Sequence, residues 1–188
     1  MNIFPGMTRD QFPELLVKCS YKLGVEVGVQ RGDHAVHILS RWPGELYLVD
    51  PWKHYDDGIY VDQGNCSDSD HEIHRKACLE QVAPFGSRAT ILRQFSADAA
   101  ELFDDGAVDF VYIDANHSYD AVLADLVAWH SKIRRGGLLS GHDYTVDGPG
   151  HGGCFGVKPA VHDFMTERGL LDLYISAEEW PTWYCFVD

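Results

Sequence analysis

The chain has 188 residues, 45% of them hydrophobic, which is enough for a sizeable folded core and argues against a disordered chain. Its formal net charge is −14, from 15 basic and 29 acidic residues. Nucleic acid and anionic membranes attract the opposite charge, so neither is an expected partner.

Five cysteines form an odd set without a C-x-x-C pair. We therefore expect neither a disulfide framework nor a cysteine zinc site, and we expect a reducing compartment. The first residues, MNIFPGMTRD, lack the basic and apolar regions of a signal peptide, and no apolar run is long enough to span a membrane. These features predict a cytoplasmic protein.

Helical and strand-like segments alternate along the chain. In chain order the pattern predicts helix 12–21, strand 24–29, helix 35–41, strand 45–50, a polar loop at 53–70, helix 71–83, strand 88–94, helix 96–103 with Ser96 as its cap, strand 108–114, helix 119–133, strand 138–143, a glycine-rich loop at 145–156, helix 157–168, and strands 171–176 and 182–188.

This alternation predicts an α/β fold with a parallel sheet that is covered by helices on both faces. The last two strands are joined by a short turn, so we expect them to pair antiparallel. No repeat or linker divides the sequence, which favours one domain over residues 1–188.

The first predicted strand runs into a glycine turn, VEVGVQRG, with Glu26, Gly28 and Gly32. The spacing differs from the G-x-G-x-x-G of dinucleotide sites, and an acid before the glycine suits a cationic amino group better than a diphosphate. Asp50 ends the second strand, where an acid can bind both hydroxyls of a ribose. Together these residues indicate an adenosine-containing ligand. The alternative is a packing turn followed by a capping aspartate.

Polar residues also end the fourth and fifth strands. Asp114 follows VDFVYI, His142 and Asp143 follow LLSG, and His117 lies three residues after Asp114. Neighbouring parallel strands end at the same edge of a sheet, so these groups can converge as ligands of a divalent cation, with His117 near enough to act as a general base. The alternatives are loop-capping carboxylates and structural histidines.

A second histidine pair, in HEIH at 71–74, lies on a predicted helix. It does not match the H-E-x-x-H zinc motif, and the sequence shows no third ligand nearby. We interpret His71 and His74 as part of a solvated helix face.

Four segments together resemble class I S-adenosylmethionine-dependent methyltransferases: VEVGVQRG, the strand ending at Asp50, FVYIDANHSYDAVLADL and IRRGGLLSGHDY. The chain is similar over about residues 20–188 to the family called methyltransferase domain 24, and to metal-dependent O-methyltransferases. The resemblance implies a Rossmann-like, doubly wound, seven-stranded sheet, mostly parallel with an antiparallel last strand.

The resemblance also assigns roles. It implies that Glu26, Gly28 and Gly32 surround the methionine end of the cofactor, that Asp50 binds the ribose, and that Ser96 and Ala97, with Asp98 alongside, contact the adenine. Asp114 matches a position that borders the cofactor and binds magnesium, Asp143 matches a second magnesium ligand, and His117 matches a general base.

His142 departs from the family pattern, because related enzymes have a carboxylate there. Imidazole is a poor ligand for Mg²⁺ and a better one for Mn²⁺, iron or zinc. Three readings stay open: the metal is not Mg²⁺, His142 binds or deprotonates the substrate as a second catalytic residue, or the site works without metal.

The sequence thus predicts S-adenosylmethionine-dependent O-methylation of a small-molecule hydroxyl, assisted by a divalent metal (Mg²⁺ or Mn²⁺) and a histidine base. The loop at 53–70, with Tyr55, Tyr60, Gln63 and Asn65, is the candidate substrate lid, and the loop at 145–156 with His151 is the candidate opposite wall. The alternatives are an NAD-dependent Rossmann oxidoreductase, a non-catalytic binding module and a metal-independent methyltransferase. A homo-oligomer stays open.

Overall fold

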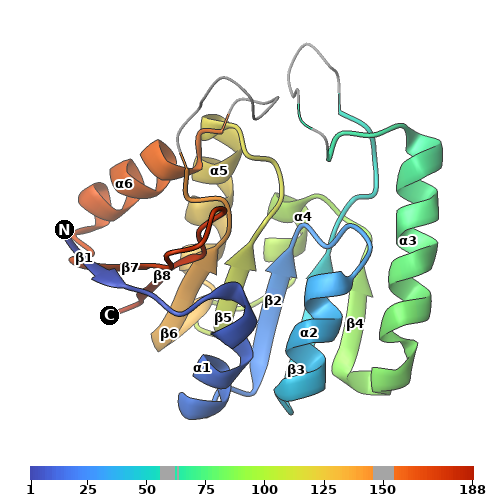
Figure 1. Cartoon of the computed structure of the whole chain (residues 1–188), viewed down its shortest axis with the longest axis horizontal. Helices are drawn as coiled ribbons and strands as arrows, with labels where there is room; N and C mark the ends of the chain where they lie inside the picture. Colours follow the sequence, from blue (N-terminus) through green and yellow to red (C-terminus); the bar gives the residue numbers. More distant parts are fainter. Residues whose placement is uncertain (56–61, 63, 146–154) are drawn as a thin grey trace.

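A computed structural model describes residues 1–55, 62, 64–145 and 155–188. Its eight strands form one sheet in the order β1-β7-β8-β6-β5-β2-β3-β4 (Figure 1). The strands are β1 (Asn2–Pro5), β2 (Leu23–Val27), β3 (Glu45–Val49), β4 (Ala89–Leu92), β5 (Val108–Ile113), β6 (Ile133–Gly141), β7 (Asp172–Ile175) and β8 (Trp183–Phe186). The helices are α1 (Phe12–Lys18), α2 (Asp33–Arg41), α3 (Asp68–Val82), α4 (Ser96–Ala100), α5 (Tyr119–His130) and α6 (Val157–Arg168), with short 3₁₀ turns at Arg9–Gln11 and Ala83–Arg88.

The strand order reverses between β2 and β5. From β2 the chain proceeds through β3 to β4 at one edge, and from β5 it proceeds through β6 towards the other. The two strands are parallel neighbours, with Val27 opposite Ile113 at their carboxyl ends. In open α/β sheets a crevice forms outside the carboxyl ends of the strands at this point, so the topology places a ligand site here.

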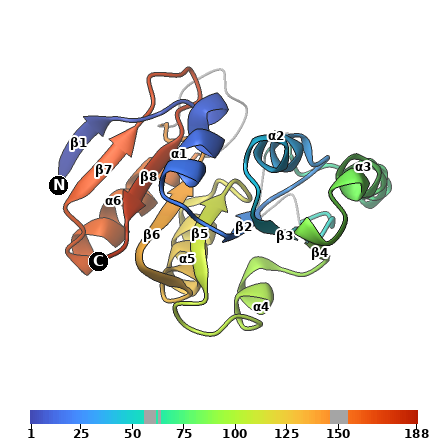
Figure 2. The same ribbon diagram turned by 90° about the horizontal axis from the view of Figure 1, so that it is seen from below.

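Alternate side chains of each central strand pack on opposite faces. On β5, Phe110 and Tyr112 join the cluster beneath α1, α2 and α3, whereas Val111 and Ile113 join the cluster beneath α4, α5 and α6. Figure 2 shows the helices in these two layers. The short apolar runs in the sequence are therefore strands buried on both faces, which confirms the predicted doubly wound α/β class.

The end of the sheet confirms one expectation and corrects another. β8 is antiparallel to both β6 and β7, as the closing hairpin predicted. The sheet has eight strands rather than seven, because β1 pairs parallel with β7. All four residues of β1 are exposed, so this edge strand lacks the alternation of buried and exposed residues that reveals strands in a sequence.

A smaller correction concerns α4. α4 ends at Ala100 rather than at 103, and its N-cap is Phe95 rather than Ser96. Trp52 and Trp183 are each 1% exposed and belong to the two cores. Tyr60, Gln63 and His151 lie outside the described residues. Over the part of the chain that is described, none of the helices has the length and apolar character needed to cross a membrane.

Candidate active site

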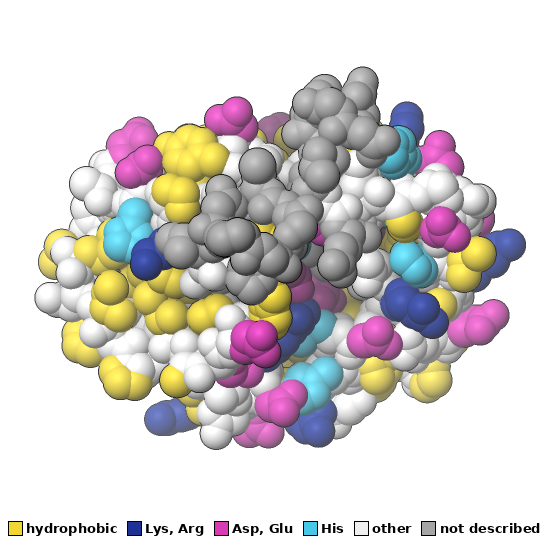
Figure 3. Space-filling model, turned by 45° about the horizontal axis from the view of Figure 1, so that its top comes forward, with side chains coloured by type: hydrophobic (Ala, Val, Ile, Leu, Met, Phe, Trp, Pro, Cys, Tyr) yellow, Lys and Arg dark blue, Asp and Glu magenta, His cyan; other side chains and the backbone are white. Residues whose placement is uncertain are grey.

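A cavity of about 770 Å³ opens at the carboxyl ends of the central strands, within the usual size range of small-molecule sites. Acidic and histidine side chains gather on this face of the molecule (Figure 3). Its walls come from the turn after β2, the segment after β3, the start of α4, the turn after β5 and the first half of α5. The site thus lies where the strand order reverses.

The turn after β2 requires glycine at position 28. Gly28 has φ +86°, and a Cβ there would lie 2.0 Å from the carbonyl oxygen of Asp114. The Asp114 amide donates to the Val27 carbonyl at 2.7 Å, which holds the two strand ends together. The absence of a side chain therefore lets β2 and β5 meet at the cavity floor.

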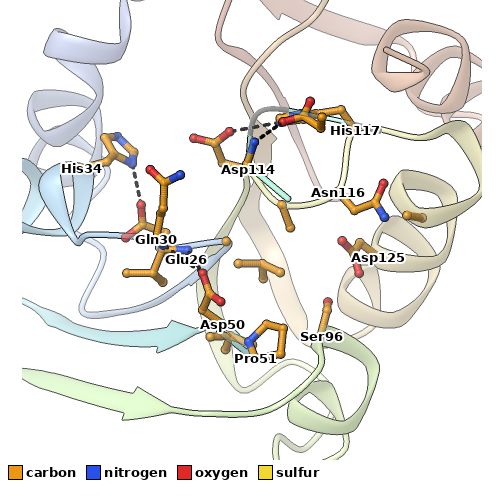
Figure 4. Close-up of a pocket in the computed structure, with 18 of the residues that line it drawn as sticks. Glu26, Gln30, His34, Asp50, Pro51, Ser96, Asp114, Asn116, His117 and Asp125 are labelled. Carbon is orange, nitrogen blue, oxygen red and sulfur yellow. Dashed lines mark hydrogen bonds and ion pairs between the residues drawn. The ribbon is translucent and has the colours of Figure 1, made fainter. Parts of the chain in front are cut away.

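Glu26 is 1% exposed and lies at the end of β2 beside this turn. Its Oε1 atom lies 3.0 Å from Nδ1 of His34 on α2 (Figure 4). Burial lowers the pKa of His34 even though Glu26 opposes the shift, so the neutral ring donates its Nδ1 proton to the carboxylate. The Oε2 atom is also buried and has no hydrogen-bond partner among the described residues. Glu26 therefore offers an unsatisfied acceptor at the cavity.

Asp50 lines the cavity opposite the same turn. Its Oδ2 atom accepts from the amides of Val29 and Gln30 at 3.0 and 2.9 Å, and its Oδ1 atom accepts from the amide of Trp52 at 2.7 Å. A carboxylate oxygen has two lone pairs, so Oδ1 keeps capacity for a ligand hydroxyl. The side chain thus holds the turn in shape and still has an acceptor site.

Gly32 lies outside the cavity wall. It precedes α2 with φ +88°, and a Cβ there would lie 3.1 Å from the sulfur of Cys78 on α3. Its conformation therefore serves the start of α2 and the close packing of α3, and the structure gives Gly32 no contact with the ligand space.

Ser96 lies at the far end of the cavity from Glu26, near Asp125 on α5 (Figure 4), and Ala97 also lines the cavity. The Trp129 indole donates to the Ser96 hydroxyl at 2.9 Å. Burial raises the pKa of Asp125 to about 6, although the Ser96 hydroxyl opposes the shift. Asp125 is not among the site residues predicted from the sequence. Its position as the one acid within the apolar stretch AVLADLVAW could have indicated a buried carboxylate.

The other end of the cavity holds a cluster of one histidine and three carboxylates. Nδ1 of His117 lies 3.1 Å from an oxygen of Asp62, whereas Nε2 lies 3.1 Å from Asp143 and 3.6 Å from Asp114. Burial by itself would lower the pKa of His117, but hydrogen bonding to the three carboxylates outweighs it and raises the pKa to about 11. The strand ends therefore converge as the sequence predicted.

Arg9 brings a cation to the same cluster from the 3₁₀ turn before α1. Its guanidinium lies 2.6 Å from Asp114 Oδ2 and 5.8 Å from the centre of the Tyr112 ring, and the Glu178 carboxylate accepts from the Arg9 amide at 2.9 Å. The sequence did not predict a role for Arg9, because residues 1–19 lie outside the predicted family resemblance.

His142 is not part of the group of possible metal ligands that contains Asp114. Its Nδ1 atom lies 3.0 Å from Asp143 Oδ1, while Asp143 uses its other oxygen for His117. Asp143 itself has φ +55°, an uncommon conformation for an aspartate, which turns the end of β6 towards the cluster. In this arrangement His142 contacts Asp143, which was predicted as a metal ligand, and does not reach the space between the carboxylates of Asp114 and Asp143.

The cluster suits a divalent cation. One ligand atom each from Asp114, His117 and Asp143 lies within 4.8 Å of the others. Oxygen and imidazole donors of this kind fit Mn²⁺, Fe²⁺ or Zn²⁺ better than Mg²⁺. The third donor is His117, where the sequence had suggested His142.

The described part of the predicted lid loop reaches the cavity. Tyr55, Asp62, Gly64 and Asn65 line it, and Asn65 hydrogen-bonds both the amide and the carbonyl of Tyr55. Asp62, which belongs to this loop, contacts His117. The sequence did not predict this contact, because the two residues lie 55 positions apart.

The family model described as a methyltransferase domain matches residues 25–144. No curated protein sequence matches the chain. Among solved structures, an O-methyltransferase family protein from Burkholderia thailandensis aligns with a TM-score of 0.64 at 14% identity, covering 96% of this chain and 59% of that one. The chain thus spans less than two thirds of this first relative.

Two further structures cover more of their own length. A caffeoyl-CoA O-methyltransferase candidate from Staphylococcus aureus aligns with a TM-score of 0.69 at 11% identity, covering 95% of this chain and 82% of that one. An O-methyltransferase from Streptomyces achromogenes, involved in tomaymycin synthesis and solved with S-adenosylmethionine, aligns with a TM-score of 0.62 at 12% identity, covering 96% and 79%. At these identities the likeness is one of fold.

Proposed function

The chain belongs to the methyltransferase domain family whose model matches residues 25–144, and we propose on this basis that it methylates a hydroxyl of a small molecule with S-adenosylmethionine. One observation carries the proposal. A single cavity has an unsatisfied buried carboxylate oxygen, Glu26 Oε2, at its glycine turn and the histidine–carboxylate cluster of His117 at another wall.

In the proposed cofactor arrangement, Glu26 accepts from the amino group of the methionine end, and Asp50 accepts from the ribose hydroxyls. Ser96, Ala97 and Asp125 face the adenine. S-adenosylmethionine supplies an electrophilic methyl group, and the protein contributes alignment of that group with the acceptor oxygen. Gly28 acts by letting β2 and β5 meet at the cavity floor, and Gly32 acts only through the packing of α2 against α3.

The acceptor side of the proposal rests on His117. Nδ1 of His117 faces Asp62 and Nε2 faces Asp114 and Asp143, and the three carboxylates keep the ring protonated at neutral pH. A divalent cation held by Asp114 and Asp143 would offset their negative charge and lower the pKa of His117, so that Nε2 could then take the proton of the acceptor hydroxyl. The same cation would supply positive charge that acidifies the hydroxyl. His142 is proposed to orient Asp143, and Arg9 to balance the charge of Asp114.

The structure of the site favours this reading over two rivals. A dinucleotide site would seat a pyrophosphate on its glycine turn, where this chain instead presents the Glu26 carboxylate. A non-catalytic binding module has no use for a histidine whose ring is held between three carboxylates.

Titration calorimetry with S-adenosylhomocysteine tests the cofactor assignment. We expect binding by chelator-treated protein and an affinity lower by about 10- to 100-fold in Glu26→Gln, because a charge-assisted hydrogen bond is lost. Glu14→Gln, an exposed glutamate on α1, is the matched control and should bind like the wild type. Folded wild-type protein that binds NAD⁺ but not S-adenosylhomocysteine would contradict the assignment.

The reaction is tested with phenol, catechol and sugar acceptors by measuring S-adenosylhomocysteine formation. We expect turnover that is lost in His117→Ala although the variant still binds the cofactor product. Addition of Mn²⁺ after chelation should restore activity if the cation is required, whereas unchanged activity with chelator would assign the proton transfer to His117 alone.

A further inference from the structure

A second group of candidate metal ligands lies at the start of α3. Cys66 stands two residues before the helix, and His71 and His74 follow one turn apart on it. One ligand atom from each residue lies within 4.8 Å of the others. The sequence interpretation of HEIH as a solvated helix face is therefore wrong for His71, which is only 8% exposed. The third residue is Cys66, which comes close because the chain turns into α3.

The buried imidazole of His71 is unsatisfied. Its Nε2 atom is inaccessible to solvent and has no hydrogen-bond partner among the described residues. Leaving a buried polar group unpaired costs about 1–3 kcal/mol. A bound ion would give this nitrogen a partner.

The separation of one donor pair is close to that of two ligands in a tetrahedral site. The sulfur of Cys66 lies 3.8 Å from Nδ1 of His74. Sulfur and nitrogen atoms bound to zinc at their usual bond lengths are separated by about 3.6 Å in tetrahedral geometry. A shift of a few tenths of an ångström would bring this sulfur–nitrogen pair to that separation.

Backbone and side-chain contacts hold Cys66 in this place. The Cys66 amide donates to the Gly64 carbonyl at 3.0 Å. The Cys66 carbonyl oxygen lies 3.0 Å from Nδ1 of His54. Ser67 caps α3 by accepting from the Asp70 amide at 3.2 Å. Cys66 and His74 are only partly buried, so an ion can enter from solvent.

We propose that Cys66, His71 and His74 bind a transition-metal ion of the zinc class, with the fourth coordination position open to water or to a ligand in the neighbouring cavity, which His71 also lines. The thiol of Cys66 loses its proton on binding and the two imidazoles coordinate as neutral rings. The soft sulfur donor distinguishes this site from the oxygen-rich cluster around Asp114.

The site would tie one active-site wall to α3. Asp62, which contacts His117, lies four residues before Cys66 in the chain. Metal coordination at Cys66 would thereby fix the end of the segment that orients His117. The role is structural, and the ion itself takes no part in the proposed methyl transfer.

Titration of Co²⁺ into chelator-treated protein tests the site, because a thiolate bound to Co²⁺ gives intense charge-transfer absorption in the near ultraviolet. The oxygen-rich cluster has no sulfur donor and cannot produce this band. We expect one equivalent of Co²⁺ to saturate it and Zn²⁺ to abolish it. Cys66→Ser should remove the band, and His71→Ala and His74→Ala should weaken Co²⁺ binding by about 100-fold or more.

Matched variants separate this site from other thiols and histidines. Cys19→Ser, His37→Ala and Asp143→Asn should keep the band, because these residues lie outside the group. Cys66→Ser tests the site even if His71→Ala fails to fold, since Cys66 is partly exposed. Absence of the band in folded wild-type protein, or a band unchanged in Cys66→Ser, would overturn the proposal. S-adenosylhomocysteine binding is measured separately in Cys66→Ser. Because this variant should still bind the ligand, the result for the metal site does not decide the result for the proposed function.

Discussion

Two buried acids lie at different ends of the cavity and differ in what surrounds them. Glu26 has His34 at one oxygen and no partner among the described residues at the other. Asp125 is enclosed by α5 and the start of α4, and burial raises its pKa to about 6. The first acid is thus prepared to accept a hydrogen bond from a ligand, whereas the second holds its proton more tightly than an ordinary aspartate does.

The raised pKa of Asp125 predicts a pH-dependent contribution to stability. Because the folded state binds this proton more tightly than the unfolded state, where the pKa is about 3.9, the contribution is fully present below pH 4 and is lost as the pH rises through about 6. Asp125→Asn removes this dependence. Between pH 4 and pH 7 the variant should gain about 2 kcal/mol of unfolding free energy relative to the wild type.

Urea unfolding of both proteins at pH 4, 5, 6 and 7 measures this difference. Asp98→Asn, which replaces an exposed acid on the neighbouring helix α4, is the control. Parallel pH profiles for wild type and Asp125→Asn would show that the Asp125 carboxyl is not buried as the structure has it.

At the scale of elements, the turns after the strands carry the unusual backbone conformations of the site. The described residues contain four non-glycine residues with positive φ, and Gln30, Trp52 and Asp143 among them follow β2, β3 and β6. Backbone strain of this kind persists where surrounding contacts fix it. The Asp50 carboxylate, which binds the amides of Gln30 and Trp52, is such a contact. The strand ends are therefore shaped for the cavity as well as for the sheet.

Gly28→Ala is expected to destabilise the junction of β2 and β5. The new methyl group would need a positive φ and would also collide with the Asp114 carbonyl, which is backbone and cannot turn aside. Gly169→Ala is a matched control, because Gly169 has φ +69° and no atom lies within 4 Å of the place its new methyl group would take. Gly28→Ala should lose about 1–3 kcal/mol more unfolding free energy than Gly169→Ala. Equal losses, measured with urea, would mean that the strand ends do not meet so closely.

At the scale of the whole molecule, the reversal of strand order joins two halves of the sheet through one cavity. Glu26 and Asp50 come from the half that contains β2 and β3, whereas Asp114 and Asp143 come from the half that contains β5 and β6. A ligand that contacts both halves binds only the folded chain. Ligand binding and global stability should therefore be linked.

S-adenosylhomocysteine at 100 times its dissociation constant should stabilise the protein by about 2.7 kcal/mol. For a chain of this size the shift in Tm is then about 5–10 °C. Thermal unfolding followed by circular dichroism measures it, with NAD⁺ as the negative control. The shift should shrink in Glu26→Gln at the same ligand concentration. A Tm that stays constant for wild-type protein would contradict binding across the two halves.

The α/β class, the reversed last strand and the convergence of Asp114, His117 and Asp143 could all be predicted from the sequence. These follow from local pattern, because short apolar runs are buried strands and parallel strands end at one edge of the sheet. Local pattern also drew attention to Glu26, which lies two residues before the first glycine of the turn, and to Asp50, which directly follows its strand. The hydrogen-bond partners of Glu26 and Asp50 could not be predicted in this way, because they lie in other segments of the chain.

The distant residues that meet these strand ends became visible only in the folded chain. Arg9 reaches Asp114 across 105 positions and Asp62 reaches His117 across 55, and both come from short or irregular segments without periodicity. The burial of His71 beside Cys66 and the edge strand β1 were hidden for the same reason. Such contacts arise from the way helices and loops pack over the sheet, and packing between remote segments leaves no regular spacing in a sequence.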